Sequence, residues 1–426
     1  MVLPREMRDS GIEWIGRIPK NWDIKRGKYI FEQKYDKGNT VSLVLLSPTQ
    51  NYGVIPQTLY EELSGFSAVK LNEKIDLNTL KTVHKGAFVI SLRSFQGGFE
   101  YSYYEGVVSP AYQVFYPILK VYDGYYRFLF KTSVFIDKMN SYTMSLRDGK
   151  NIAFADFGRT YIHLPPYVEQ KQIADFLDSK CAEIDALYKE IENQIKTLEE
   201  YKRSVITEAV TKGLNPEAEM KDSGIEWVGE IPSHWHIHPV YSCFGERKNK
   251  NTALKEKNLL SLSYGKIIRK DINTVGGLLP ASFNTYNIIE AGDIIIRPTD
   301  LQNDKRSLRT GLVKERGIIT SAYIDLMPKG EVNSEYFHYL LHSYDVQKVF
   351  YNMGNGVRQG LNYSEFSKLM IFSPPINEQI QIVDYLNSKC SEIDAIIDSK
   401  KEQLELLDEY KKSLIYEYVT GKKEVI

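Results

Sequence analysis

The chain has 426 residues, of which 42% are hydrophobic and 26% charged, and its formal net charge is −1. This composition excludes collagen-like and disordered proteins, and the near-neutral charge argues against a protein that coats nucleic acid with its whole surface. No signal-peptide core and no run approaching 18 apolar residues occurs, so we expect a cytoplasmic protein. Of the three cysteines, Cys181 and Cys390 occupy matching positions and are expected to be small buried hydrophobes rather than a disulfide.

A short element near the N-terminus occurs twice. Asp9–Trp22 returns as Asp222–Trp235, and the two copies contain all four tryptophans of the chain. Large aromatic side chains bury much apolar surface, and the element has no cluster of nucleophiles, bases or metal ligands. We therefore expect each copy, called an anchor below, to pack against the end of a helix rather than to bind a ligand.

A globular region follows each anchor. In both regions, short apolar runs separated by Gly and Pro predict strands, and a later segment predicts a helix. The first region has expected strands at Val41–Leu46, Ala87–Leu92 and Ala111–Tyr116 and an expected helix at Tyr125–Met139. The second region has expected strands at Asn258–Ser263, Gly292–Arg297 and Ile318–Ile324 and an expected helix at Tyr336–Phe350. Each region is therefore predicted to be a mixed α/β domain, mostly sheet.

A long helix follows each globular region. From Pro165 and again from Pro374, apolar residues recur in alternating steps of four and three, which is the spacing of a coiled-coil seam. About 44 residues at 1.5 Å each make a helix roughly 66 Å long. Lys202 and Lys411 occupy matching seam positions, where a lysine costs stability but can fix register and orientation. The alternative is that each lysine snorkels outward along its stem.

The order of anchor, globular region and long helix thus occurs twice, which fits a duplicated domain rather than a solenoid. We predict an α+β fold. Two mixed α/β domains, mostly sheet, are joined by two long antiparallel coiled-coil helices, and the halves are related by a pseudo-two-fold axis. The expected boundaries are 1–165 for the first anchor and domain, 166–212 for the central helix, 213–374 for the second anchor and domain, and 375–426 for the C-terminal helix.

Two repeated motifs resemble those of a known family. The helix start Pro165-Pro-x-x-Glu-Gln-x-x-Ile and the anchor Ser10-Gly-Ile-Glu-Trp-x-Gly-x-Ile-Pro-x-x-Trp each occur twice, in the same order. With their duplication around two divergent globular regions, they make the whole chain similar to the DNA-sequence specificity subunit of type I restriction-modification enzymes.

The resemblance implies a function and a set of partners. It implies two target-recognition domains that read a bipartite, asymmetric DNA target, one domain for each half-site. Double-stranded DNA, two methyltransferase subunits docked on the helices, and restriction subunits would be the partners. S-adenosylmethionine, ATP and Mg would be used by those partner subunits, so that no cofactor is expected in this chain.

Positive charge collects in the globular regions. Residues 241–329 contain 15 Lys and Arg against 9 Asp and Glu, and residues 25–130 contain 12 against 9. Basic patches favour contact with phosphates, and Arg, Gln and Asn side chains pair with base edges. A polar loop follows one strand of each region, and we expect DNA contact there, although such loops are also commonly just solvated. The candidate DNA-binding residues in these loops are Arg93, Gln96, Arg297, Gln302, Asn303, Arg306 and Arg309.

A second pair of loops, Leu146–Lys150 and Gly354–Gly360, precedes a helix in each copy. Both loops are basic and contain glycine, which allows close approach of the backbone to phosphates. The candidate DNA-binding residues in these loops are Arg147, Lys150, Arg358 and Gln359.

Signals for catalysis are weak. The segment His234–His238 alternates three histidines as a metal-binding strand would, but its counterpart Asn21–Lys25 has none. His338 and His342 have helical spacing without an acidic third ligand, and no P-loop or nucleophile elbow occurs. We therefore expect neither a catalytic nor a metal site in this chain. Two alternatives remain open: a coiled-coil scaffold that binds DNA without sequence preference, and a stand-alone nuclease or methyltransferase with a divergent active site.

Overall fold

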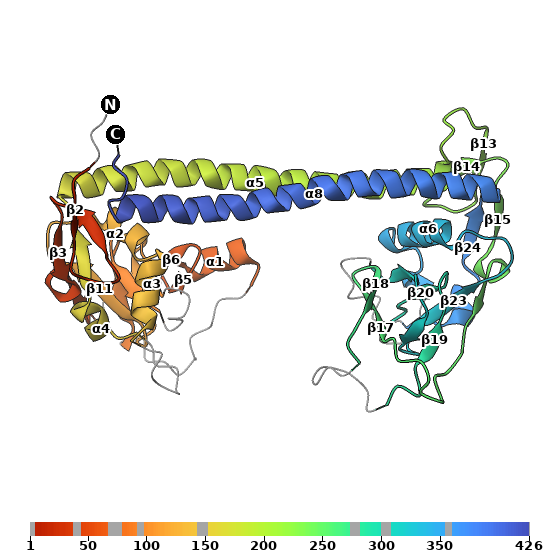
Figure 1. Ribbon diagram of the computed structural model, residues 1–426, viewed down its shortest axis with the longest axis horizontal. Coiled ribbons are helices and arrows are strands. Elements are labelled where there is room, and N and C mark those ends of the chain that lie inside the picture. Colours follow the sequence, from red (N-terminus) through yellow and green to blue (C-terminus); the bar gives the residue numbers. More distant parts are fainter. Residues whose placement is uncertain are drawn as a thin grey trace. The chain divides into compact units, whose positions relative to one another are not determined.

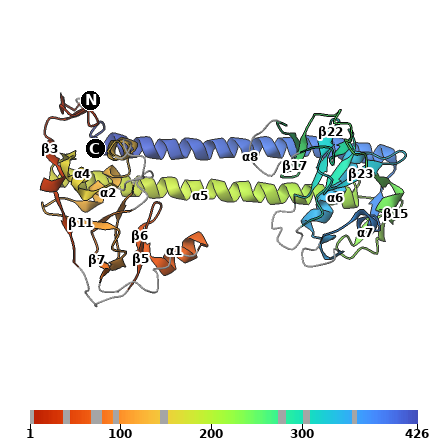
Figure 2. The ribbon, with the colours of Figure 1, turned by 90° about the horizontal axis from the view of Figure 1, so that it is seen from below.

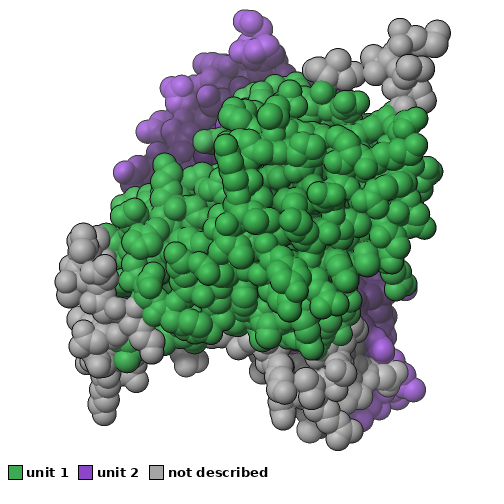
Figure 3. All heavy atoms as spheres, turned by 90° about the vertical axis from the view of Figure 1, so that its left-hand side faces the viewer, with its two compact units in different colours: residues 1–191, 402–426 green, residues 192–401 purple. Residues whose placement is uncertain are grey.

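The computed structural model describes residues 5–36, 44–66, 79–91, 98–142, 152–272, 282–299, 308–353 and 360–425 (Figures 1 and 2). The chain forms two compact units, coloured separately in Figure 3. Unit 1 comprises Met1–Ile191 with Glu402–Ile426, and unit 2 comprises Glu192–Lys401.

Unit 1 contains a four-stranded antiparallel sheet in the order β4-β11-β8-β9. Four two-stranded ladders, β1 with β2, β3 with β12, β5 with β6, and β7 with β10, surround it. The strands are β1 (Met7–Asp9), β2 (Arg17–Pro19), β3 (Asp23–Arg26), β4 (Phe31–Lys34), β5 (Leu46–Thr49), β6 (Gly53–Pro56), β7 (Lys81–Val83), β8 (Phe88–Ile90), β9 (Phe99–Tyr101), β10 (Gly106–Val108), β11 (Gln113–Pro117) and β12 (Tyr161–Leu164). The short helices are α1 (Gln57–Ser64), α2 (Asp123–Leu129), α3 (Ser133–Asn140) and α4 (Phe154–Arg159).

Unit 2 repeats this arrangement, with a sheet in the order β16-β23-β20-β21. The strands are β13 (Met220–Asp222), β14 (Glu230–Pro232), β15 (His236–Pro239), β16 (Phe244–Glu246), β17 (Leu260–Ser263), β18 (Lys266–Arg269), β19 (Asn287–Ile289), β20 (Ile294–Ile296), β21 (Thr310–Leu312), β22 (Gly317–Ile319), β23 (Ile324–Pro328) and β24 (Met370–Ser373). The helices are α6 (Ser334–Val346) and α7 (Tyr363–Phe366). The predicted α+β class and the duplication are therefore confirmed.

Both sheets are buried on their two faces. In β8, Phe88 and Ile90 face the larger core of unit 1, while Val89 faces a smaller one. Ile294 and Ile296 of β20 likewise face the larger core of unit 2, and Ile295 the smaller. Successive side chains of a strand point to opposite faces, so burial on both faces requires a continuous apolar run. This explains why these strands could be predicted without polar alternation.

Most of the predicted strands are present, but the bounds predicted for one of them were wrong. The strands expected at 87–92, 111–116, 258–263 and 292–297 correspond to β8, β11, β17 and β20, whereas Val41–Leu46 lies partly outside the described residues. The segment Ile318–Ile324, predicted as one strand, instead contains the end of β22 and only the first residue of β23. A turn separates them, because the Thr320 hydroxyl accepts a hydrogen bond from the Ala322 amide at 3.3 Å.

The helix predicted at Tyr125–Met139 is also corrected, because the structure has two helices there, α2 and α3. The Thr132 hydroxyl donates to the Leu129 carbonyl at 2.7 Å and so offers the backbone an alternative to helix continuation. In unit 2 the equivalent helix α6 is continuous over 13 residues. It starts at Asn333, whose side chain accepts from the amides of Glu335 and Tyr336.

The two long helices are α5 (Tyr167–Lys212) and α8 (Ile376–Val419). In unit 1, the rings of Phe176 and Tyr418 are 4.5 Å apart, and further along α5 Lys411 of α8 reaches Asp185 at 2.6 Å. As α5 advances, its partners on α8 recede, so the helices pack antiparallel, as predicted. The free cysteines Cys181 and Cys390 are buried in this packing, as expected.

The seam lysines do not snorkel into water. Lys202 Nζ donates to both carboxylate oxygens of Asp394, at 2.7 and 2.6 Å, within unit 2. Lys411 Nζ donates to one carboxylate oxygen of Asp185, at 2.6 Å, within unit 1. Both side chains are partly buried, and each pairs with an aspartate on the other helix. The duplication thus repeats one interhelical ion pair, and the interpretation that these lysines fix register is favoured.

The anchors pack where predicted, at the helix ends. Trp22 and Trp235 are buried, and the glycines that follow the helices, Gly421 and Gly213, lie against them. The indole of Trp235 also donates to Glu378, in the first turn of α8, at 3.1 Å. Each anchor therefore holds the end of one long helix and the start of the other.

Candidate nucleic-acid interface

The first pair of predicted DNA-binding loops occupies the same place in both units. In unit 1 the loop connects β8 to β9, and in unit 2 it connects β20 to β21. These strands are antiparallel neighbours at one side of each sheet. In unit 1 the base of the loop is closed by a hydrogen bond from the Ser91 amide to the Gly98 carbonyl at 2.7 Å. The predicted structural correspondence of the two loops is thus confirmed.

Described residues at the ends of the second pair of loops lie beside those at the ends of the first pair. In unit 2, the Leu361 amide donates to the Pro298 carbonyl at 3.0 Å, which joins the ends of the two loops directly. In unit 1, the Gln113 side chain donates to the Ile152 carbonyl at 2.9 Å, and Gln113 is paired with Ile90 at the end of β8. In each unit, the described ends of two polar loops that are far apart in sequence therefore meet at one edge of the sheet.

Most candidate DNA-binding residues lie outside the described residues, and for them the prediction stays a prediction. These are Arg93, Gln96, Arg147, Lys150, Gln302, Asn303, Arg306, Arg358 and Gln359. Arg297, directly after β20, is described and its side chain is exposed to solvent at the start of the loop. That exposure is compatible with the predicted contact with DNA.

Arg309, the other described candidate, has a structural position. Its side chain is only 5% exposed, and its guanidinium donates to the Thr299 carbonyl across the loop. The Arg309 amide donates to Asp345 of α6 at 2.7 Å, and Asp345 also accepts from the Tyr351 hydroxyl at 2.8 Å. A base contact by Arg309 would require its present bonds to be exchanged. In this structure the residue holds the base of the loop.

Each sheet contains a buried ionic group. In unit 1, Lys131 donates to both oxygens of Glu100 at 2.6 and 2.7 Å. Burial raises the pKa of Glu100 to about 7, and the ammonium of Lys131 opposes that shift. The Lys131 ammonium also donates to the Gln50 carbonyl at 3.3 Å and so ties the β5–β6 connection to β9.

Unit 2 buries a different group. Arg247 binds Asp293 in a bidentate manner at 2.6 and 3.0 Å, and Asp325 lies 3.9 Å from the same guanidinium. Burial, with the neighbouring Asp293 carboxylate adding to it, raises the pKa of Asp325 to about 8. Both Asp325 oxygens are buried without a hydrogen-bond partner. The Asp293 and Asp325 carboxylates are too deeply buried to contact a ligand, and with the partly exposed Arg247 they act in the stability of the sheet.

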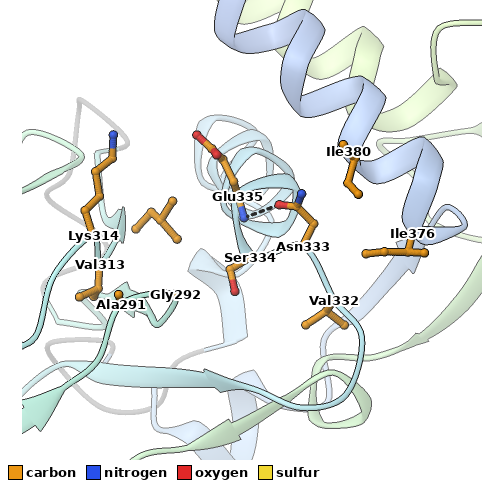
Figure 4. Close-up of a pocket in the computed structure, with 11 residues that line it drawn as sticks. Ala291, Gly292, Val313, Lys314, Val332, Asn333, Ser334, Glu335, Ile376 and Ile380 are labelled. Carbon is orange, nitrogen blue, oxygen red and sulfur yellow. Dashed lines mark hydrogen bonds between the residues drawn. The ribbon is translucent and has the colours of Figure 1, made fainter.

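Unit 2 has a cavity of about 590 Å³ at the start of α6 (Figure 4). Lys314, Ser334, Glu335 and Ile380 line it, together with Asn333. The Asn333 side chain is occupied in capping α6. No nucleophile and base are paired among the lining residues, so the cavity offers no catalytic arrangement.

The histidines noted in the sequence either contact neighbouring side chains or are buried in the fold. His234 Nε2 lies 2.8 Å from Glu378 Oε2, and His238 Nε2 lies 2.7 Å from the Ser373 hydroxyl. Burial lowers the pKa of His338 and of His342 to about 4. In the described part of the chain, no three His, Cys, Asp or Glu side chains are grouped to hold a metal ion. None of the helices described there combines the length and apolarity needed to cross a membrane.

Sequence reasoning missed two exposed tyrosines next to the first loops, Tyr52 and Tyr264. Each precedes a glycine at the tip of a hairpin, β5–β6 in unit 1 and β17–β18 in unit 2. The available signal was a Tyr-Gly dipeptide that occurs at this place in both halves, Tyr52-Gly53 and Tyr264-Gly265.

The comparisons with known proteins agree on one family. Residues 19–197 match the family model described as the type I restriction modification DNA specificity domain. The MjaVIII specificity subunit of a type I restriction enzyme from Methanocaldococcus jannaschii is 24% identical over 434 residues, which cover 96% of this chain and 94% of that protein. The chain is therefore similar over almost its whole length to the specificity subunits of type I restriction enzymes.

Other relatives and solved structures are similar over different lengths. The putative MjaX specificity subunit of the same organism is 27% identical over 274 residues, covering 62% of this chain and 59% of that protein. A chain solved to explain complex assembly and conformational transition of a type I R-M system has a TM-score of 0.69, with 95% and 99% of the two chains covered. The HsdS subunit from Thermoanaerobacter tengcongensis has a TM-score of 0.54, with 95% and 98% covered. Both structures are 13% identical to this chain and show the shared fold.

Proposed function

We propose that this chain reads a bipartite, asymmetric DNA target, one half-site with each globular domain. The observation that supports the proposal most is the pairing of loop ends: in each unit the described residues at the ends of two polar loops meet at one edge of the sheet, at equivalent places. The domains share a skeleton but differ in loop sequence, which suits readers of two different half-sites. The scaffold that binds DNA without sequence preference finds no support in the comparisons.

The long helices carry features suited to two copies of one partner. Leu187 and Ile396 occupy equivalent positions of α5 and α8 and are 48% and 47% exposed. Tyr201 and Tyr410 are equivalent in the same way and are 53% and 56% exposed. Single exposed apolar residues are ordinary, but the same two positions exposed in both copies fit two identical docking sites. We assign these sites to two methyltransferase subunits, and restriction subunits would join that complex.

Catalysis would then belong to the partners. The chain would be a non-catalytic recognition subunit acting in the cytoplasm, and S-adenosylmethionine, ATP and Mg would be bound by methyltransferase and restriction subunits. The paired helices would set the separation of the two half-sites and hence the length of the spacer.

The test is methylome sequencing of a methylation-free host that expresses this chain with its cognate methyltransferase. An interrupted motif with one modified adenine on each strand is expected. If the assembled complex modified no motif, the scaffold function would replace this proposal.

A further inference from the structure

Two β-hairpins present a tyrosine at equivalent places in the two units. In unit 1, Thr49 pairs with Gly53, so three residues connect β5 to β6, the last of them Tyr52. In unit 2, Ser263 pairs with Lys266, so only Tyr264 and Gly265 connect β17 to β18. The connections differ in length, yet both place a tyrosine directly before a glycine of positive φ, 71° at Gly53 and 76° at Gly265.

The two turns are built differently. In unit 1, the Thr49 hydroxyl accepts from the Tyr52 amide at 3.1 Å and donates to the Gly53 carbonyl at 2.9 Å. The two-residue turn of unit 2 has positive φ at both positions, with 48° at Tyr264. Asn, Asp and Gly adopt this conformation readily, whereas a tyrosine there costs stability. The turn itself thus gives no reason for a tyrosine.

Burial gives no reason either. Tyr52 is 42% exposed and Tyr264 is 69% exposed. A large aromatic residue that is exposed in both copies, and in one copy held in an unfavourable backbone conformation, is a candidate for contact with a ligand.

Each hairpin lies beside the strand that follows the first DNA-binding loop. In unit 1, Val54 of β6 forms a bridge with Ser102, and the Gly53 backbone approaches the Tyr101 carbonyl closely. In unit 2, Gly265 lies against Leu308, at the end of the corresponding loop. Both tyrosines therefore stand next to the candidate interface with DNA.

We propose that Tyr52 and Tyr264 are DNA-contact residues, one for each half-site, whose phenol hydroxyls donate to a backbone phosphate. The inference rests on the proposed function. A neutral hydroxyl with a single proton suits a phosphate oxygen, whereas base recognition uses the paired groups of Arg, Asn and Gln. A phosphate contact carries no sequence information, so both tyrosines contribute to binding of any duplex.

The experiment measures binding of the full chain, assembled with its methyltransferase, to a duplex that contains the target and to one that lacks it. Tyr52→Phe and Tyr264→Phe each remove only the hydroxyl and should weaken binding of both duplexes by about 3- to 10-fold. Tyr29→Phe and Tyr241→Phe are matched controls, because the exposure of these tyrosines, 56% and 53%, lies between those of Tyr52 and Tyr264, and they stand on short 3-10 turns outside the hairpins. The controls should leave both affinities unchanged.

A second variant separates binding from folding. Tyr264→Asn places a residue suited to positive φ before Gly265, so it should raise the melting temperature while it weakens DNA binding. Hairpin-tip variants that bind like the controls would overturn the inference while leaving the proposed function intact, provided that the wild type still methylates its interrupted motif. A loss confined to the target duplex would overturn the phosphate assignment, and a wild type that binds no DNA would overturn both proposals.

Discussion

The two sheets have the same strand arrangement, but they bury different polar groups. Where unit 2 buries Asp293 and Asp325, unit 1 has the apolar Ala87 and Val114 at the equivalent positions of its sheet. The reverse holds next to the first loop, where unit 1 buries Glu100 with Lys131 and unit 2 has a glycine, Gly311.

The anchors and the long helices differ from the sheets, because their contacts are the same in both halves. The interhelical ion pairs recur in both halves, and so does a buried tyrosine that donates to the end of a long helix, Tyr125 to Val419 and Tyr336 to Val210. Anchors and helices are therefore fixed in both copies, while each sheet is stabilised in its own way. The following substitutions test that difference.

The largest effect is expected from Arg247→Met. It leaves Asp293 and Asp325 buried without their cation and should lower the free energy of unfolding by about 3 to 5 kcal/mol. Lys34, the equivalent residue of unit 1, has an exposed side chain, so Lys34→Met should change stability by less than about 0.5 kcal/mol. Denaturant unfolding of the two variants measures the contrast, and equal losses would show that the ion cluster is not specific to unit 2.

A pH-dependent difference is expected at His163, which lies at the position of Phe372. Its buried imidazole has no hydrogen-bond partner and lies 5.5 Å from the Trp14 ring. Burial lowers the pKa of His163 to about 3. Below about pH 6.5 the imidazole therefore binds a proton in the unfolded chain but stays neutral in the folded chain. Stability contributed by the neutral ring is present above pH 6.5 and is lost as the pH falls.

The free energy of unfolding of the wild type should therefore fall by on the order of 3 kcal/mol between pH 7 and pH 4, and His163→Phe should remove that fall. Because Phe372 stacks on Trp235 with ring centres 5.8 Å apart, a phenylalanine has a precedent in this position. Melting temperatures across that range, compared with those of the wild type, measure the effect. Parallel curves for the two proteins would contradict it.

Exchange of all three residues of the cluster should restore the stability that Arg247→Met removes. The triple variant Asp293→Ala, Asp325→Val and Arg247→Lys installs the residues of unit 1, and replacement of a buried ionic cluster by apolar residues is neutral or stabilising by about 1 to 4 kcal/mol. If the triple variant unfolded as easily as Arg247→Met, the two interiors would not be interchangeable. Denaturant midpoints of both variants decide this.

The smallest effect is expected at the helix seam. A double-mutant cycle on Lys202 and Asp394 should give a coupling of about 0.2 to 1 kcal/mol, because the pair is partly exposed, and the cycle on Lys411 and Asp185 should give the same value. Equal coupling energies would support the interpretation that both ion pairs fix the register of the helices. A clear inequality would mean that the halves of the seam are energetically different.

Local and periodic features could be predicted from the sequence. The helices, the anchors and the continuous apolar strands each leave a pattern within a short window, and they were found. The break between α2 and α3 accompanies a single local hydrogen bond of the Thr132 hydroxyl, which the residue type alone does not announce. The meeting of the loop ends depends on Gln113 in one unit and on Pro298 in the other. The Gln113 contact joins residues 39 positions apart and has no local signature. The seam lysines were located from the sequence, but their aspartate partners could be assigned only once the antiparallel register was known.

The most direct test of two independent readers is a domain graft. Residues 25–164 would be replaced by the equivalent segment of a relative with a different target, and the methylated motif would be sequenced in a methylation-free host. One half of the interrupted motif should change, while the other half and the spacer remain the same. A change in both halves would contradict the division of recognition between the two domains.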